Sequence, residues 1–492
     1  MSTTVSCDKT CKSLWQTTVE VMKLSAPNVA GCLILFLGQI ATVQSFSQRD
    51  ARAEVSAIGL GGFMFSMFGL AIGLGLSGAL DTIVSQAIGS GKTDVASVNL
   101  AQARLVTLLA VAPCALILSY TKPILVGIKM DLDFAADAAQ YTHWQMIGLM
   151  PLFWYCALSC FLRASNRTTA PLVANLVGTV IHVVLAVVLL YVFEFGVITA
   201  SLIAAGANIA RWITLELYIY LLPTEESSIC SIGAFFRTLG DKSRAKQVFS
   251  GITVFTLLAL PSTAMMWSEW FAAEAQTLIA GLTHKAYVAA NIELATVSVF
   301  AFMVPVGICQ TASFLVGSSL GRGDAKSAKQ YSVVSLMITS IAMVVIAIAF
   351  YFTRNYLVNK KAIMADLRAD SVIALDQMMK AFPILCAFTW IDGMQNVLEA
   401  ILRGMRMQRS AVWIKMFSML GVRLILGYVL CVHANMGVEG LWIGATVGMF
   451  ISSSVYTVML MRADFEAKAD EAKFASEAVD TGCVTPDQVK AL

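Results

Sequence analysis

The sequence predicts an all-α, polytopic membrane protein with twelve transmembrane helices, arranged as two six-helix bundles related by a parallel internal repeat. Three observations support this fold class. The 492-residue chain is 58% hydrophobic and 13% charged, whereas soluble domains carry about 25% charged residues. Its apolar residues gather into twelve long runs, giving a mean hydropathy of +0.75. Short motifs of the first half also recur, in the same order, in the second half.

Each apolar run is long enough to cross a bilayer. A hydrocarbon core of about 30 Å requires roughly 20 apolar residues in a helix. Lipid offers the backbone no hydrogen-bonding partner, so each span must be helical. The predicted spans cover residues 24–46, 55–84, 98–119, 136–160, 170–192, 197–221, 250–281, 290–317, 331–353, 378–402, 411–432 and 438–461.

The distribution of Lys and Arg predicts the orientation, because basic residues of short loops favour the cytoplasm. The loops on the side of the N-terminus carry more basic residues, spread more evenly, than those on the other side, where the loop at 354–371 is the main exception. The first 18 residues are polar and lack the apolar region of a signal peptide. We therefore expect both termini to be cytoplasmic, in the plasma membrane or in a vacuolar or vesicular membrane.

The longest polar interruption separates six predicted spans from six others. We accordingly divide the chain into an N-terminal tail, an N-terminal bundle, a cytoplasmic linker, a C-terminal bundle and a C-terminal tail, which cover residues 1–23, 24–221, 222–249, 250–461 and 462–492. The C-terminal tail is rich in Ala, Glu and Lys, and we expect it to be solvated, with at most a short helix that frays.

Four pairs of anchors mark the internal repeat. Leu24–Pro27 corresponds to Leu258–Pro261, Ile88–Gly91 to Leu320–Gly323, Phe161–Arg163 to Ile401–Arg403, and Gly196–Val197 to Gly437–Val438. The offsets are 234, 232, 240 and 241 residues. Because six spans are an even number, both halves enter the membrane in the same sense. This predicts a parallel repeat with a cavity between the halves.

Two glycine motifs resemble nucleotide sites but do not fit them. Gly73–Gly78 matches G-x-G-x-x-G, and Gly91-Lys92-Thr93 resembles the end of a phosphate loop. Both require a preceding strand, and the phosphate loop requires a glycine where Gln86 stands. Glycines in membrane helices usually permit close packing. We expect no nucleotide and no other cofactor.

The chain also offers little for metal or nucleic-acid binding. Cys7 and Cys11 have no His at a ligand spacing, so we expect no metal site there. The four histidines are scattered and fit structural roles. A net charge of +3 gives no reason to expect nucleic-acid binding. We expect a monomer that contacts the lipid bilayer.

Acidic residues inside the predicted spans are the strongest functional signal. A charge in lipid costs at least about 2.5–3.5 kcal/mol, so such residues tend to face a cavity. The first span has Gln39 but no acid, whereas the second half contains Glu269, Glu274, Glu293, Asp392 and Glu399. Pairing with Arg403 and Arg423, or an interfacial position, is the structural alternative for these acids.

Helical geometry places part of this set on one face. At about 100° per residue, Asp392 and Glu399 share a face with Gln395, Asn396 and Arg403, a polar stripe typical of a cavity wall. Glu269 and Glu274 are separated by about 140°, so a straight helix cannot direct both at one point.

These residues suggest proton exchange. A carboxyl group away from water favours its protonated form, so it can exchange a proton near neutral pH. The deprotonated carboxylate attracts an organic cation, and protonation releases it. Trp267, Trp270 and Trp390 could hold a flat cation through cation–π contacts, although packing or a place in an interfacial belt is the alternative for each.

At these motifs the sequence resembles the eukaryotic branch of the multidrug and toxic compound extrusion (MATE) family. The resemblance rests on Ala79–Lys92, on Leu260-Pro261 with Ser268–Glu274, on Asn291–Leu294 with Met303–Gly307, and on Trp390–Asp392 with Leu402–Gly404. Three departures from the family's motifs are Phe271, in place of a Trp, Arg406, in place of a Gly, and Leu315–Gly317, which lacks the usual Arg-Val.

The resemblance implies two six-helix bundles and export driven by protons or sodium. It implies that Glu269, Glu274, Glu293 and Asp392 serve proton coupling and cation binding. We therefore expect a secondary active antiporter that exports organic cations, drugs or toxic metabolites in exchange for protons, and no enzyme. The alternatives are sodium coupling and a lipid-linked precursor flippase, although acids rather than bases among the cavity candidates disfavour anionic lipids.

Overall fold

A computed structural model describes residues 13–47, 52–128, 130–221, 227–364 and 369–480. All regular elements in these ranges are helices. The α-helices are α1 (Leu14–Ser47), α2 (Arg52–Phe65), α3 (Ala71–Gly89), α4 (Thr93–Ser119), α5 (Thr121–Gly127), α6 (Leu132–Gln145), α7 (Leu149–Ala164), α8 (Thr169–Leu185), α9 (Val197–Leu221), α10 (Ser227–Cys230), α11 (Ile232–Gly240), α12 (Lys242–Gly281), α13 (Lys285–Gly321), α14 (Ala325–Met364), α15 (Ala369–Gly404), α16 (Gln408–Met416), α17 (Leu424–Tyr428), α18 (Val438–Arg462) and α19 (Phe465–Asp480). Short π-helical segments are η1 (Ser66–Leu70), η3 (Ala186–Val192), η4 (Phe417–Arg423) and η5 (Val429–His433), and η2 (Met146–Gly148) is a 3₁₀ turn.

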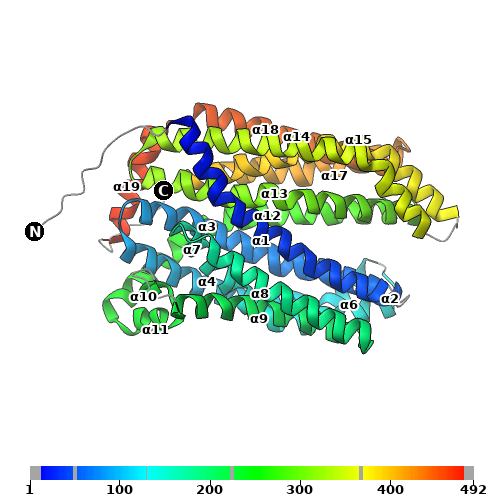
Figure 1. Cartoon of the computed structure of the whole chain (residues 1–492), viewed down its shortest axis with the longest axis horizontal. Coiled ribbons are helices and arrows are strands. Elements are labelled where there is room, and N and C mark those ends of the chain that lie inside the picture. The colour runs from blue at the N-terminus through cyan, green and yellow to red at the C-terminus, as the bar shows by residue number, and fades with distance from the viewer. Residues whose placement is uncertain (1–12, 48–51, 129, 222–226, 365–368, 481–492) are drawn as a thin grey trace, which may run out of the picture.

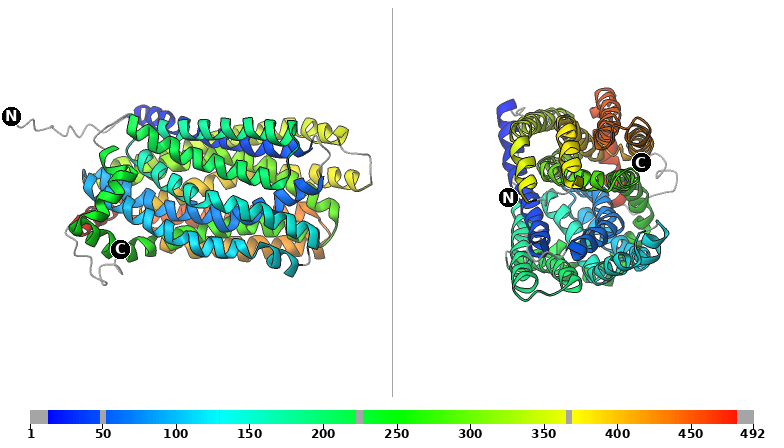
Figure 2. Two further views of the ribbon diagram at one scale, coloured as in Figure 1. Left: turned by 90° about the horizontal axis from the view of Figure 1, so that it is seen from below. Right: turned by 90° about the vertical axis from the view of Figure 1, so that its right-hand side faces the viewer.

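Twelve of the helical stretches within the described ranges are long and apolar enough to cross a membrane. They run side by side along the long axis of the molecule (Figures 1 and 2). Several spans combine two or more elements; the second joins α2, η1 and α3. The twelve predicted spans are therefore confirmed, and most helices extend a few residues beyond the predicted limits. The chain is an integral, multi-pass membrane protein.

The backbone confirms the internal repeat at three turns. Each turn has a residue with positive φ, and these residues pair as Gly91 (78°) with Gly323 (75°), Asn166 (61°) with Arg406 (60°), and Glu194 (55°) with Asn435 (54°). The pairs are separated by 232, 240 and 241 residues, as are three of the sequence anchors. The hydrogen bonds repeat too, since Gly91 N donates to Ile88 O (3.0 Å) and Gly323 N donates to Leu320 O (2.9 Å).

Arg406 occupies one of these left-handed positions. Glycine adopts this conformation without strain, which explains why the family's motif has a glycine at this position. A side chain in this conformation costs roughly 1–2 kcal/mol. Burial lowers the pKa of the Arg406 guanidinium to about 10, and Glu471 on α19 opposes that shift.

Glycines of α3 serve helix packing, as predicted from the sequence. A Cβ at Gly73 would press on Phe153 of α7, and one at Gly75 would overlap Thr263 of α12. α3 also packs along α13, so this helix of the N-terminal half (α1–α9) contacts the C-terminal half (α12–α18), as α1 does through α13 and α14.

The contact between the halves is tightest at the end of α3. A Cβ at Gly89 would overlap the carbonyl oxygen of Ser318, and a Cβ at Gly321 would overlap that of Gln86. Side chains lock the same region, since Gln86 Nε2 donates to Gly404 O (3.0 Å). One buried core cluster therefore extends through both halves.

The C-terminal tail corrects our expectation of a solvated segment. Residues 465–480 form α19, which packs against α3 and α4 of one half and against α13 and α14 of the other. Its Ala469 and Ala472 are buried in the core cluster shared by the halves. The start of α1, α10, α11 and α19 lie together at one end of the molecule, here called the α19 end (Figure 1).

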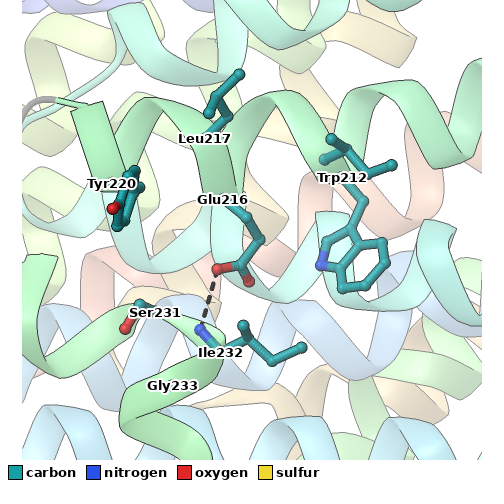
Figure 3. Close-up of a pocket in the computed structure, with 8 residues that line it drawn as sticks. Trp212, Glu216, Leu217, Tyr220, Ser231, Ile232 and Gly233 are labelled. Carbon is teal, nitrogen blue, oxygen red and sulfur yellow. Dashed lines mark hydrogen bonds between the residues drawn. The ribbon is translucent and has the colours of Figure 1, made fainter.

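The linker is likewise more structured than a polar tether. Arg104 of α4 donates through Nη2 to Glu216 of α9 (2.9 Å) and to the carbonyl oxygen of Cys230 (2.9 Å). Figure 3 shows the other carboxylate oxygen of Glu216 accepting from the backbone N–H of Ile232 (3.0 Å). The hydrogen bonds from this ion pair to Cys230 and Ile232 attach α10 and α11 to the N-terminal half.

We predict that Gly89→Val lowers stability by about 1–3 kcal/mol, because the added atoms force α3 away from α13. Intrinsic tryptophan fluorescence during thermal unfolding measures the effect. Gly206→Val is the matched control, because a Cβ at Gly206 of α9 meets no atom within 4 Å. An unchanged melting temperature for Gly89→Val would contradict the close contact.

Candidate functional site

A fully buried lysine joins two acids from different helices of the C-terminal half. Lys415 of α16 is 0% exposed. Its Nζ donates to Glu269 Oε2 of α12 (2.7 Å) and to Glu399 Oε2 of α15 (2.9 Å). Glu399 also accepts from Gln395 Nε2 (3.3 Å) and lies 3.8 Å from Arg403 Nη1. The ion cluster thus ties α12, α15 and α16 together.

Asp392 lies beside this cluster without an ion pair of its own among the described residues. It is 5% exposed, and its Oδ1 accepts from Asn396 Nδ2 (3.1 Å). Glu269, Lys415 and Arg423 lie within electrostatic range of its carboxyl group. The contacts of Asp392, Gln395, Asn396, Glu399 and Arg403 follow one face of α15, as the helical spacing predicts.

A second polar chain continues from Arg423. Its Nη2 donates to Gln276 Oε1 of α12 (3.0 Å), and Gln276 Nε2 donates to Asn291 Oδ1 of α13 (3.1 Å). Glu269, Asp392 and Glu274 all interact electrostatically with Arg423. Glu274 is thus linked to the cluster through Arg423 and not through Lys415, in keeping with its different angular position on α12.

The other predicted residues lie outside these hydrogen bonds. Glu293 is half-buried on α13. Trp390 is 38% exposed, and its indole Nε1 donates to Ser340 Oγ (3.1 Å). Trp267 and Trp270 are half-buried on α12, and Gln39 is exposed on α1. Trp267 stacks on Phe271 at 4.9 Å, so it packs within its own helix.

The charges of the buried cluster nearly balance. Four carboxyl groups (Glu269, Glu274, Asp392 and Glu399) lie near three cationic groups (Arg403, Lys415 and Arg423). When all are ionised, the cluster carries one excess negative charge. One further positive charge would neutralise this excess. Within the described residues, no group of three or more His, Cys, Asp or Glu is arranged to hold a metal ion.

Lys415 was missed in the sequence analysis, although a signal for it exists. It lies inside the predicted span at 411–432, where a lysine is as costly as the arginines that we noted. Its partners are 146 and 16 residues away in sequence, so the pairing itself could not be predicted from the spacing.

A family model and the similar proteins of known name both point to one family of transporters. The family model MatE matches residues 27–188 and 261–429. The chain is 25% identical to multidrug and toxin extrusion protein 1 of Danio rerio over 463 residues, covering 92% of this chain and 74% of the relative. It is 25% identical to protein DETOXIFICATION 9 of Arabidopsis thaliana over 469 residues, covering 94% and 92%.

A solved structure shares the fold. The eukaryotic MATE transporter AtDTX14 superimposes with a TM-score of 0.85 at 19% sequence identity, covering 94% of this chain and 99% of that one. The two matched segments of the family model lie on either side of the linker and together span more than half of the chain. The chain belongs to the MatE family of multidrug and toxin extrusion transporters.

Proposed function

We propose that this protein is a secondary active antiporter that exports organic cations in exchange for protons. The observation that carries the proposal is the excess of one carboxyl group over the cationic groups of the buried C-terminal cluster. A single positive charge neutralises this excess, whether a proton or a monovalent organic cation brings it. Proton and substrate then exclude each other electrostatically, as coupled exchange requires.

Asp392 and Glu269 are the proposed protonation sites, and Glu274 and Glu293 support them. Asp392 has an amide partner but no ion pair among the described residues, so its negative charge is the one most open to a proton. Glu269 already shares the ammonium of Lys415. Binding of a proton at Glu269 would free Lys415 to pair with Glu399 alone, which couples protonation to the packing of α12 against α16.

We further propose that both termini lie in the cytoplasm, so that the α19 end is the cytoplasmic end. The close contact at Gly89 and Gly321 fits a state that is closed toward the cytoplasm. Rocking of the two halves, tethered by the linker, would alternate access to the cluster.

The first test uses Asp392→Asn in proteoliposomes with an imposed pH gradient and a fluorescent organic cation. We expect the gradient-driven efflux rate of Asp392→Asn to fall at least about 100-fold, because the amide cannot take up a proton. Glu269→Gln should show a similar fall. Asp376→Asn is the matched control: Asp376 also lies on α15, but it is exposed and pairs with Lys380 (2.6 Å). Normal transport by both Asp392→Asn and Glu269→Gln would refute the assignment.

The same vesicles distinguish the coupling ion. We expect efflux of a monovalent cation to follow an imposed pH gradient, to ignore a sodium gradient, and to be insensitive to a potassium diffusion potential, because one proton replaces one charge. Efflux that follows sodium at equal pH on both sides would instead establish sodium coupling.

Lys415→Gln should destabilise the protein more at pH 8 than at pH 5.5. Removing one partner of a buried ion pair costs about 3–5 kcal/mol, because an uncompensated charge remains. Protonation of Glu269 or Glu399 at low pH removes that charge, so the variant loses less stability at pH 5.5 than at pH 8. Melting temperatures at both pH values measure the difference, and Lys415→Arg, which keeps the charge, should show a smaller loss. A loss that does not depend on pH would contradict this account of the ion cluster.

A further inference from the structure

The N-terminal half contains a buried arginine with an unbalanced charge. Arg211 of α9 is 9% exposed, and its Nη1 donates to Asn208 Oδ1 (2.7 Å), one turn earlier on the same helix. Its Nε is buried and has no hydrogen-bonding partner. The side chain lies against Gly178 of α8, where a Cβ would overlap its Cγ.

No carboxylate compensates this charge among the residues that the structure describes. The other buried arginines that the structure describes in this half show the usual solution. Arg104 pairs with Glu216 at 2.9 Å and donates to two backbone carbonyl groups, and Arg163 lies 3.8 Å from Asp81. Arg211 has one neutral amide instead. A buried ion without a partner costs several kcal/mol, so an anionic group bound at Arg211 would relieve a cost that the free protein carries.

The side chains around Arg211 are suited to an anion. On α8, Asn175, Gly178, Thr179 and His182 follow the i, i+3, i+4, i+7 spacing of one helix face. Thr179 Oγ1 is buried and has no hydrogen-bonding partner. The His182 ring lies within electrostatic range of Arg211.

Tyr155 of α7 also interacts electrostatically with Arg211, and its hydroxyl group donates to Asn175 Oδ1 (2.6 Å). The surroundings of the guanidinium thus contain hydroxyl, amide and imidazole groups from α7, α8 and α9. Asn175 Nδ2 already donates to Gly31 O (3.4 Å), and His182 Nε2 is hydrogen-bonded to Thr42 Oγ1 (2.8 Å). Arg211 Nε and Thr179 Oγ1 are the buried polar atoms of this set without a partner. This set can hold the oxygens of a carboxylate, for which the guanidinium fork is the best match in proteins.

The position in the bundle relates this site to the acidic cluster. Arg211 precedes the end of α9 by ten residues, and Asp392 precedes the end of α15 by twelve, which correspond to depths of about 15 Å and 18 Å. Both helices end at the α19 end of the molecule. A basic group in one half and acidic groups in the other therefore lie at similar depth.

We propose that Arg211 forms an anion-binding subsite in the N-terminal half, which recognises a carboxylate or sulfonate group of the transported solute. Together with the acids of the C-terminal half, it selects amphoteric compounds, which carry a cationic amine and an anionic group. The binding of the amine by the C-terminal acids rests on the proposed function, whereas the anion subsite at Arg211 does not.

A matched pair of probes tests the inference in proteoliposomes. Ciprofloxacin carries both an amine and a carboxylate, and its ethyl ester keeps the amine but lacks the anion. We expect Arg211→Gln to raise KM for ciprofloxacin about tenfold or more and to leave KM for the ester within twofold. Arg211→Lys should give an intermediate KM, because it keeps the charge but not the fork. Arg244→Gln, a change at an exposed arginine paired with Asp94 (3.2 Å), is the control. An equal effect on both probes, or no effect on either, would overturn the proposal.

A binding measurement keeps this test independent of transport. In detergent, ciprofloxacin should raise the melting temperature of the wild-type chain more than the ester does, and Arg211→Gln should abolish that difference. If the wild type binds ciprofloxacin selectively but no pH gradient drives efflux of either probe, the proposed antiport fails while the anion subsite stands. Equal binding of both probes to the wild type overturns the subsite even if pure cations are exported.

Discussion

The ammonium group of Lys415 is the interaction on which the C-terminal half depends. Three helices, α12, α15 and α16, each place one charged group at this point, and none of the three groups can leave the cluster without stranding the others in a medium of low dielectric. A buried ion cluster of this kind contributes little net stability compared with apolar packing, but it is costly to break. It therefore holds α12, α15 and α16 in one packing arrangement.

The contact between the halves follows a different physical principle. At Gly89 and Gly321, backbone atoms of α3 and α13 approach so closely that even a methyl group would not fit. Such a contact consists of uncharged backbone atoms, so separating the two helices there would leave no buried charge without a partner. At the same end of the molecule, α19 packs against both halves, and α11 of the linker contacts α4 and α12. Chain segments outside the twelve spans therefore also hold the halves together.

The internal repeat supplies the same backbone twice but not the same chemistry. Turns with positive φ recur at equivalent positions, down to matching hydrogen bonds. The buried charges differ, because the N-terminal half holds Arg104, Arg163 and Arg211, whereas the buried acids among the described residues, Glu269, Asp392 and Glu399, lie in the C-terminal half. One backbone plan thus carries a buried arginine without an acidic partner among the described residues in one half, and a cluster of buried acids in the other.

The sequence by itself determined the twelve spans, the parallel repeat and the polar face of α15, because these depend on hydrophobicity and helical periodicity, which are local. It also predicted that intramembrane acids mark the site. Only the tertiary structure decided which charges meet. Lys415 pairs with Glu269, which lies 146 residues away in the sequence. Arg211 pairs with no acid among the described residues, and α19 packs against the bundle instead of remaining solvated. These outcomes depend on how the helices pack in three dimensions, and the electrostatic balance of a buried group is set by neighbours that are distant in sequence.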